Sequence, residues 1–137
     1  MQGCILYFSG TTMKFADLGL SEELLKSVAE AGYDEPTPIQ AQAIPPVLMM
    51  KDIIGIAQTG TGKTASFVLP MIDILAHGRS RARMPRSLIL EPTRELAAQV
   101  AENFEKYGKN HNLTRTLDGP VRSRTDIDVG LRIAGHR

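Results

Sequence analysis

Eight consecutive residues near the middle of the chain have the residue types that bind nucleotide phosphates. They are, in order, Ala57, Gln58, Thr59, Gly60, Thr61, Gly62, Lys63 and Thr64. The glycines let backbone N–H groups approach phosphate oxygens because no Cβ intervenes. At this spacing Lys63 is suited to the β- and γ-phosphates and the Thr64 hydroxyl to Mg²⁺. The pattern predicts a phosphate-binding loop, and the alternative is a tight strand–helix turn with a solvated lysine.

Such a loop needs a strand before it and a helix after it, and both are predicted. Residues 52–57 form a short apolar run typical of a buried strand. A helix is expected from Lys63 to about Ala76. A second strand is expected at 87–91, followed by a helix over 93–107 with apolar residues on one face. Strand, turn, helix, strand, helix is the alternation of an α/β domain with a parallel sheet.

Two further helices are predicted upstream. Ser21 is a suitable N-cap for the first, which Gly32 should end. Residues 37–40 (TPIQ) form a capping box with proline at the first helical position of the second. Pro45 and Pro46 are expected to bend or break that second helix.

Composition limits the class of protein. The 137 residues are 42% hydrophobic and 23% charged, which describes an ordinary soluble globular chain of one domain or part of one. No apolar run approaches the ~20 residues of a membrane-spanning helix, so no membrane partner is expected. Cys4 is the single cysteine, which fits a reducing compartment and predicts a cytoplasmic location. The histidines (His77, His111 and His136) lack metal-ligand spacing and receive no role.

The two ends of the chain differ from its middle. Residues 1–12 have no periodic pattern and are predicted to be a disordered leader. Every lysine and every aromatic residue precedes position 110, and no useful apolar stripe follows Leu113. We therefore expect a domain over 13–113 and a divergent, poorly ordered tail over 114–137, for which a shifted reading frame is one interpretation.

Three ordered strings resemble motifs of bacterial-type DEAD-box RNA helicases. The loop from Ala57 to Thr64 is similar to their nucleotide-binding motif, in which alanine in first place is usual. Residues 32–40 (GYDEPTPIQ) look like their Q motif, with Phe15 at the upstream aromatic position. Residues 92–97 (PTRELA) look like their motif Ia. Order and spacing agree over about residues 13–113.

This resemblance implies an incomplete RecA-like P-loop NTPase domain that binds ATP and Mg²⁺. Gln40 would pair with the adenine edge and Phe15 would stack on the ring. Lys63 and Thr64 would be the catalytic residues of the loop, with Thr64 also the metal ligand. The alternatives are that Gln40 only closes its capping box and that Phe15 only packs in the core. The side-chain amide of Gln40 cannot fully make both the capping-box contact and the adenine contact. We favour adenine recognition in the ATP-bound state.

The resemblance also implies an RNA contact at Pro92, Thr93 and Arg94. An arginine and the N–H groups of a helix start would bind the RNA sugar–phosphate backbone, which makes binding sequence-independent and sensitive to salt. The alternative is a plain helix start, in which Pro92 ends a strand and Thr93 caps the next helix.

The acidic motif Asp-Glu-Ala-Asp of the family is absent from this sequence, as is the second RecA-like domain that activity needs. We expect an N-terminal fragment of an ATP-dependent helicase and leave open whether it is an enzyme by itself. The alternatives are a non-catalytic remnant, a nucleotide-dependent interaction module, or another phosphate-loop ATPase or kinase. In the family fold the neighbours of the phosphate-loop strand carry later motifs, so the strand at 52–57 would keep an unpaired apolar edge and the chain would be marginally stable.

Overall fold

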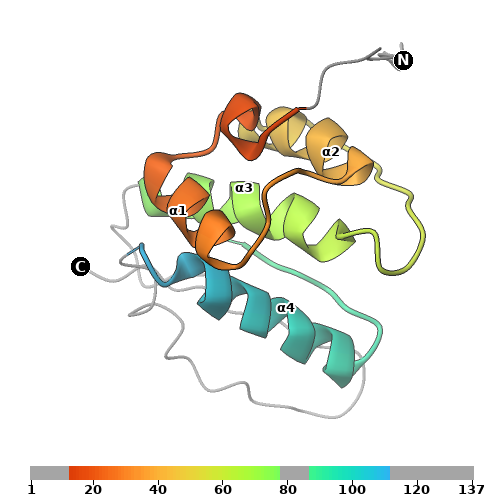
Figure 1. The fold of residues 1–137 in the computed structure, drawn as a ribbon. Helices are drawn as coiled ribbons and strands as arrows, with labels where there is room; N and C mark the ends of the chain where they lie inside the picture. The colour runs from red at the N-terminus through yellow and green to blue at the C-terminus, as the bar shows by residue number, and fades with distance from the viewer. Residues whose placement is uncertain (1–12, 78–86, 112–137) are drawn as a thin grey trace.

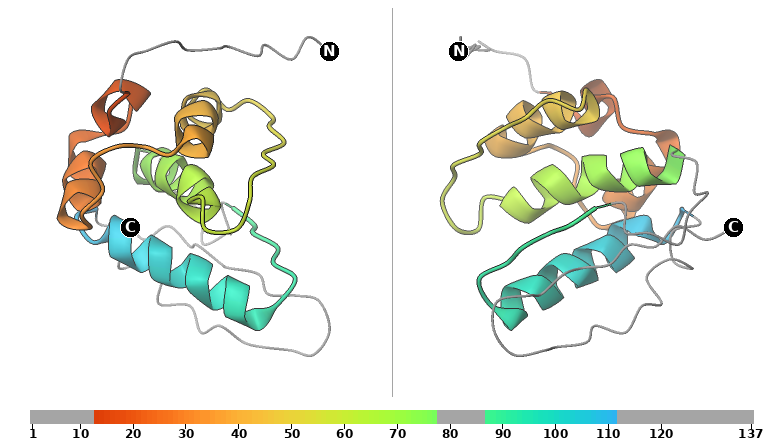
Figure 2. Two further views of the ribbon diagram at one scale, coloured as in Figure 1. Left: turned by 45° about the vertical axis from the view of Figure 1, so that its right-hand side comes forward. Right: turned by 180° about the vertical axis from the view of Figure 1, so that it is seen from behind.

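The computed structural model describes residues 13–77 and 87–111, and the regular structure within these ranges is helical. A short 3-10 helix, η1 (Phe15–Leu18), precedes α1 (Glu22–Glu30), α2 (Pro38–Leu48), α3 (Lys63–His77) and α4 (Arg94–Gly108). In Figures 1 and 2, α3 lies between α2 and α4, and α1 packs against α3 and α4. No helix of these ranges is long and apolar enough to cross a membrane. The predicted leader at 1–12 and tail at 114–137 lie outside the described residues.

The four predicted α-helices are confirmed, with ends close to those expected. Ser21 is the N-cap of α1, and Gly32 follows that helix at φ 81°, in the left-handed region that glycine tolerates. Thr93 caps α4, because its Oγ1 accepts a hydrogen bond from the Leu96 N–H at 3.2 Å. The start of α4 is set by a local side-chain hydrogen bond, which is why the sequence predicts it well. The Ser21 side chain makes no such capping bond, although Ser21 is at the expected position.

The two prolines of α2 do not break that helix, so of the expected bend or break the break is contradicted. The helix continues through Pro45 and Pro46 to Leu48. Ala43 and Ile44 are buried in the packing of α2 against α3. Tertiary packing therefore overrides the local cost of the two missing N–H donors.

One hydrophobic cluster holds the helices together, and α3 is at its centre. The cluster takes residues from every helix, and its fully or nearly fully buried members include Leu24, Val28, Ile44, Val68, Leu69, Ile72, Val100, Phe104 and Tyr107. Leu96, in the first turn of α4, is exposed. The core therefore begins at the second turn of α4 and leaves its first turn open.

The expected parallel sheet is not seen in the described residues. Segments 52–57 and 87–91 have no strand pairing, and the side chains of Ile54 and Ile56 are 93% and 91% exposed. A strand gains its hydrogen bonds only from a neighbouring strand, whereas a helix makes its own. An apolar run in the sequence therefore indicates a segment whose side chains favour burial. It does not show that a neighbouring strand is present to pair with it.

Candidate nucleotide-binding site

The loop between segment 52–57 and α3 is closed on itself. The Nζ of Lys63 donates a hydrogen bond to the Ala57 carbonyl at 2.6 Å, so the first and seventh residues of the motif are joined. The Thr61 hydroxyl donates to the Gln58 carbonyl, also at 2.6 Å. Lys63 is exposed and has no carboxylate partner at ion-pair distance within the described ranges. Its charge is held by a neutral oxygen that an anionic phosphate oxygen can replace.

Gln40 links α2 to this loop. Its Oε1 accepts a hydrogen bond from the Thr37 N–H at 2.9 Å, which is the capping-box contact predicted from the sequence. Its Nε2 donates to the Gly62 carbonyl at 3.2 Å, and this second contact was not predicted. Gln40 is only 4% exposed. Both ends of the amide are therefore used inside the protein, one on α2 and one at the residue before α3.

Gly62 permits this link because it has no side chain. Its φ of 79° lies in the left-handed region, which a residue with a Cβ adopts at a cost. A Cβ at this position would also collide with the Nε2 of Gln40 and lie 3.5 Å from the Oγ1 of Thr37. That Oγ1 is buried without a hydrogen-bond partner. The close approach of loop and α2 therefore depends on the glycine.

Thr64 lies half-buried in the first turn of α3, directly after Lys63. Residues 13–77 and 87–111 contain no group of three or more His, Cys, Asp or Glu side chains that could hold a metal ion. One hydroxyl is a poor Mg²⁺ site by itself, because Mg²⁺ takes six oxygen ligands. The donor set fits an ion whose remaining ligands are nucleotide phosphates and water.

Phe15 is buried, whereas the residues of the string that resembles motif Ia are exposed. Phe15 is 5% exposed and belongs to the core cluster, so stacking on a base requires its ring to become accessible. Pro92, Thr93 and Arg94 are all exposed at the start of α4. Figures 1 and 2 show that α3 and α4 begin on the same side of the molecule. The lysine of the loop and the arginine of α4 are therefore on one side.

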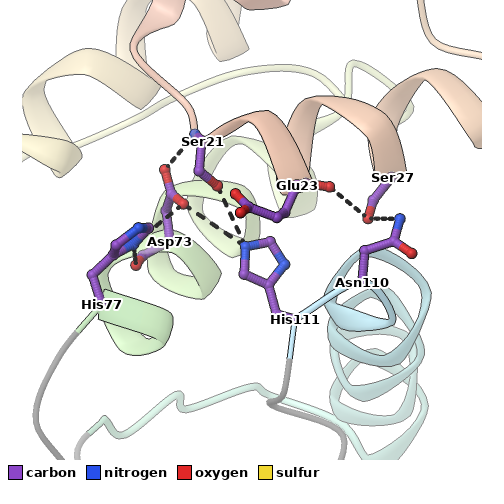
Figure 3. Close-up of polar contacts among 7 residues, drawn as sticks. All are labelled: Ser21, Glu23, Ser27, Asp73, His77, Asn110 and His111. Carbon is purple, nitrogen blue, oxygen red and sulfur yellow. Dashed lines mark hydrogen bonds and ion pairs between the residues drawn. The ribbon is translucent and has the colours of Figure 1, made fainter.

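A buried polar cluster on the other side was missed by sequence reasoning. Figure 3 shows that it gathers around Asp73 of α3, whose Oδ2 accepts a hydrogen bond from the Ser21 N–H at 2.9 Å. The His111 Nε2 lies 4.0 Å from the Asp73 Oδ1 and 3.4 Å from the Ser21 Oγ. The His77 Nδ1 lies 2.8 Å from the Asp73 carbonyl oxygen. These contacts tie α1, α3 and the end of α4 together.

Burial lowers the pKa of His111, against the opposing effect of the Asp73 and Glu23 carboxylates; His77 adds to the lowering. The sequence holds one signal for this cluster: Asp73 is the single acid in α3, a mostly apolar helix, and His77 follows it one turn later. Ser21 lies 52 positions before Asp73 in the chain and 90 positions before His111. Spacing in the sequence alone does not reveal contacts over such separations.

Comparison with known proteins gives a consistent set of relatives. Residues 37–129 match the model of the DEAD/DEAH box helicase family. The DEAD-box ATP-dependent RNA helicase CshA of Bacillus cereus is 49% identical over 119 residues, covering 86% of this chain and 21% of the relative. RhpA of Helicobacter pylori, which has the same description, is 50% identical over 103 residues, covering 75% of this chain and 20% of the relative. The chain thus spans about a fifth of the length of these curated relatives.

Two solved structures resemble the described fold. The RNA helicase Prp28 of Chaetomium thermophilum, solved bound to ADP, gives a TM-score of 0.66 at 43% identity and covers 71% of this chain and 24% of that one. A DEAD box protein from Methanococcus jannaschii gives 0.63 at 39% identity and covers 73% and 26%. These neighbours are RecA-like helicase domains, so the coarse fold assignment is supported while the sheet itself is not seen here.

Proposed function

The chain belongs to the DEAD/DEAH box helicase family, and we propose that it is the ATP-binding part of an ATP-dependent RNA helicase. The observation that carries this proposal is the hydrogen bond from Gln40 to the Gly62 carbonyl. It joins the residue expected to read adenine to the loop expected to hold the phosphates. The two proposed recognition elements are therefore in direct contact.

Nucleotide binding on this proposal exchanges internal contacts for contacts to ATP. The ammonium of Lys63 leaves the Ala57 carbonyl for the β- and γ-phosphates, where a charge-assisted hydrogen bond is stronger. The N–H groups of the loop and the start of α3 face the same phosphates. Thr64 supplies one hydroxyl ligand to Mg²⁺ held by the nucleotide. Gln40 turns its amide from the loop to adenine, and Phe15 moves to stack on the ring.

Titration of the chain with Mg²⁺·ATP tests the proposal. Lys63→Gln should weaken ATP binding about tenfold or more, because it removes a hydrogen bond between charged groups. Lys51→Gln is the matched control, since Lys51 is an exposed lysine outside the loop. Equal affinities for the two variants would contradict nucleotide binding by this loop.

The role of Gln40 has its own test in nucleotide selectivity. Adenine offers an N6 donor and an N7 acceptor that suit an amide, whereas guanine offers two acceptors on the same edge. Gln40→Ala should therefore reduce the preference for ATP over GTP. Gln42→Ala, on the exposed face of the same helix, should leave it intact. Unchanged selectivity in the Gln40 variant would limit Gln40 to the structural contacts seen here.

We also propose that Pro92, Thr93 and Arg94 contact an RNA backbone. The open start of α4 and the exposed arginine support this, because amide N–H groups at a helix N-terminus and a guanidinium both bind phosphate. Such contacts carry no base information, so two unrelated single-stranded RNA sequences should bind alike. A strong preference for one sequence would contradict the proposal.

Hydrolysis and strand separation require groups that this sequence does not contain, since the Asp-Glu-Ala-Asp motif is absent. We therefore propose that the chain alone is a nucleotide-binding module and that catalysis needs a polypeptide with the missing acids and a second RecA-like domain. The exposed apolar residues of segments 52–57 and 87–91 favour a module that contacts further polypeptide. Single-turnover hydrolysis of ATP in the presence of RNA distinguishes a nucleotide-binding module from a complete enzyme. Rapid hydrolysis by the chain alone would show a complete enzyme.

A further inference from the structure

The buried carboxylate of Asp73 joins the N-terminal segment of the described chain to α3. Its Oδ2 accepts a hydrogen bond from the Ser21 N–H at 2.9 Å, across 52 positions of the sequence. Figure 3 shows this carboxylate turned from α3 toward the start of α1. Asp73 is only 6% exposed, so water competes little for the contact. A buried hydrogen bond to a carboxylate is among the stronger ones, and we regard this contact as an anchor.

Segment 14–21, which contains Phe15, ends at this anchor. The first part of the segment is closed by its own contacts, since the Lys14 N–H donates to the Asp17 Oδ2 at 2.9 Å. Gly19 follows η1 at φ 85°, in the left-handed region that glycine adopts without strain. The segment therefore has an internally bonded turn at one end, a conformationally permissive residue behind it, and a last residue that is fixed to α3.

This arrangement bears on the proposed stacking of Phe15 on adenine. The ring is 5% exposed in the core and has to leave it to reach a base. While Ser21 stays fixed to α3, only the few residues between Phe15 and Gly19 need to change conformation. Without the anchor, the whole segment would gain freedom once the ring is released, and ordering it again on the base would cost part of the binding free energy.

We propose that Asp73 is a positioning residue for nucleotide, because it fixes segment 14–21 to α3 and so sets where the Phe15 ring stacks on adenine. The proposal rests on the proposed function and adds a residue to it that does not touch the nucleotide. α3 begins at Lys63, so the phosphate loop and the anchor belong to one helix and lie about 15 Å apart along its axis. The base contact and the phosphate contact are thereby tied to the same element.

A proline at position 21 removes the anchor while keeping the backbone conformation. Ser21 has a φ of −64°, which is the value that proline adopts, and proline has no N–H to donate. In titrations of the full 137-residue chain, Ser21→Pro should weaken Mg²⁺·ATP binding roughly fivefold or more, as loss of a base–aromatic stack does. Binding of Mg²⁺ and inorganic triphosphate, which has no base, should be unchanged.

Glu22→Pro is the matched control. Position 22 is the first residue of α1 and is exposed, and proline is favoured there because the N–H of that position has no partner inside a helix. Ser21, the residue before it, already has a ψ of 155°, which suits a residue that precedes proline. Glu22→Pro should therefore bind ATP and triphosphate as the parent chain does.

Two further comparisons show whether the effect passes through Phe15. Stacking tolerates either purine, so Ser21→Pro should weaken ATP and GTP binding by the same factor, unlike Gln40→Ala. Phe15→Leu keeps an apolar side chain but cannot stack, so adding Ser21→Pro to it should cause no further loss of ATP affinity. A merely structural effect would instead lower the affinities for ATP and triphosphate alike and would add to the effect of Phe15→Leu.

Substitutions of Asp73 break the same contact from its other end. Asp73→Ala should match Ser21→Pro in every titration. Asp73→Asn retains an oxygen that can accept the Ser21 N–H and should restore most of the ATP affinity. Circular dichroism of each variant without nucleotide should show that the helices are retained.

Several outcomes would overturn the proposal. ATP affinity that is unchanged or higher without the anchor is the first, and a parallel loss of triphosphate binding is the second. The third is additive losses from Ser21→Pro and Phe15→Leu. If neither Ser21→Pro nor Asp73→Ala folds, the contact is a requirement for folding and the proposal is also wrong. A parent chain that binds neither ATP nor triphosphate would refute the proposed function itself, and this proposal would fall with it.

Discussion

The helical core around α3 and the side of the molecule that holds the loop differ in burial and in the partners of their polar groups. In the core, Leu24, Ile44 and Ile72 are fully buried, and the buried Asp73 carboxylate accepts a hydrogen bond from α1. On the loop side, the lysine and the isoleucines face solvent, and Lys63 and Thr61 donate hydrogen bonds to carbonyls of their own loop. The core is stabilised by contacts among its own side chains, whereas the lysine and the isoleucines of the loop side remain exposed. Stability and the proposed binding are therefore assigned to different residues.

The strongest test of this division is a pair of isoleucine substitutions. Ile72→Ala should reduce the free energy of unfolding by about 2–5 kcal/mol, because it leaves a cavity in the core. Ile54→Ala, at a residue that is 93% exposed, should change it by less than about 0.5 kcal/mol. Urea denaturation followed by circular dichroism measures both. Similar losses would mean that segment 52–57 is covered in solution and that the two regions are not separate.

A pair of glycine substitutions sharpens the comparison at the border of the two regions. Gly60 and Gly62 both have positive φ, but only a Cβ on Gly62 would collide with Gln40. Gly60→Ala should cost about 1 kcal/mol of unfolding free energy from backbone strain alone. Gly62→Ala should cost more, about 1–3 kcal/mol, since it also displaces the buried amide. Denaturation of the two variants gives the difference, and equal costs would show that Gln40 moves aside freely.

A substitution on the loop side should affect binding and leave stability alone. Arg94→Gln removes an exposed cation at the start of α4 and should change unfolding by less than about 0.5 kcal/mol. Its RNA affinity should fall, and the dependence of log affinity on log salt should become shallower by about 1. Fluorescence anisotropy with a labelled oligonucleotide at several salt concentrations measures this. An unchanged slope would place the RNA contact elsewhere.

The sequence predicts this molecule well where hydrogen bonds are local and poorly where they are not. The ends of α1 and α4 follow from Gly32 and Thr93, each within a few residues of its partner. The phosphate-binding role of the loop stays a prediction from its motif. The link from Gln40 to Gly62 spans 22 positions and was not predicted. Whether 52–57 becomes a strand depends on a neighbour that local pattern does not specify.

The buried cluster around Asp73 provides the smallest predicted effect. Burial holds the pKa of His111 below its usual 6.5, even though the Asp73 and Glu23 carboxylates oppose the shift and His77 favours it. The unfolded chain therefore binds a proton at His111 more readily than the folded chain does. As pH falls through the usual range of histidine, protonation favours unfolding, so the stability that neutral His111 contributes is present above about pH 6.5 and is lost below it.

Replacing His111 should remove this dependence. His111→Gln keeps a polar side chain of similar reach that does not titrate, so its unfolding free energy should vary less between about pH 7 and pH 5 than that of the parent chain. His77→Gln is the comparison variant and should change the pH dependence less, because His77 is mostly exposed and is the smallest of the named contributions to the lowered pKa of His111. Denaturation midpoints across this pH range decide the matter. If the parent chain gains stability toward acid and the His111 variant does not, protonated His111 pairs with Asp73, and the cluster is an ion pair in the folded state instead of a neutral contact.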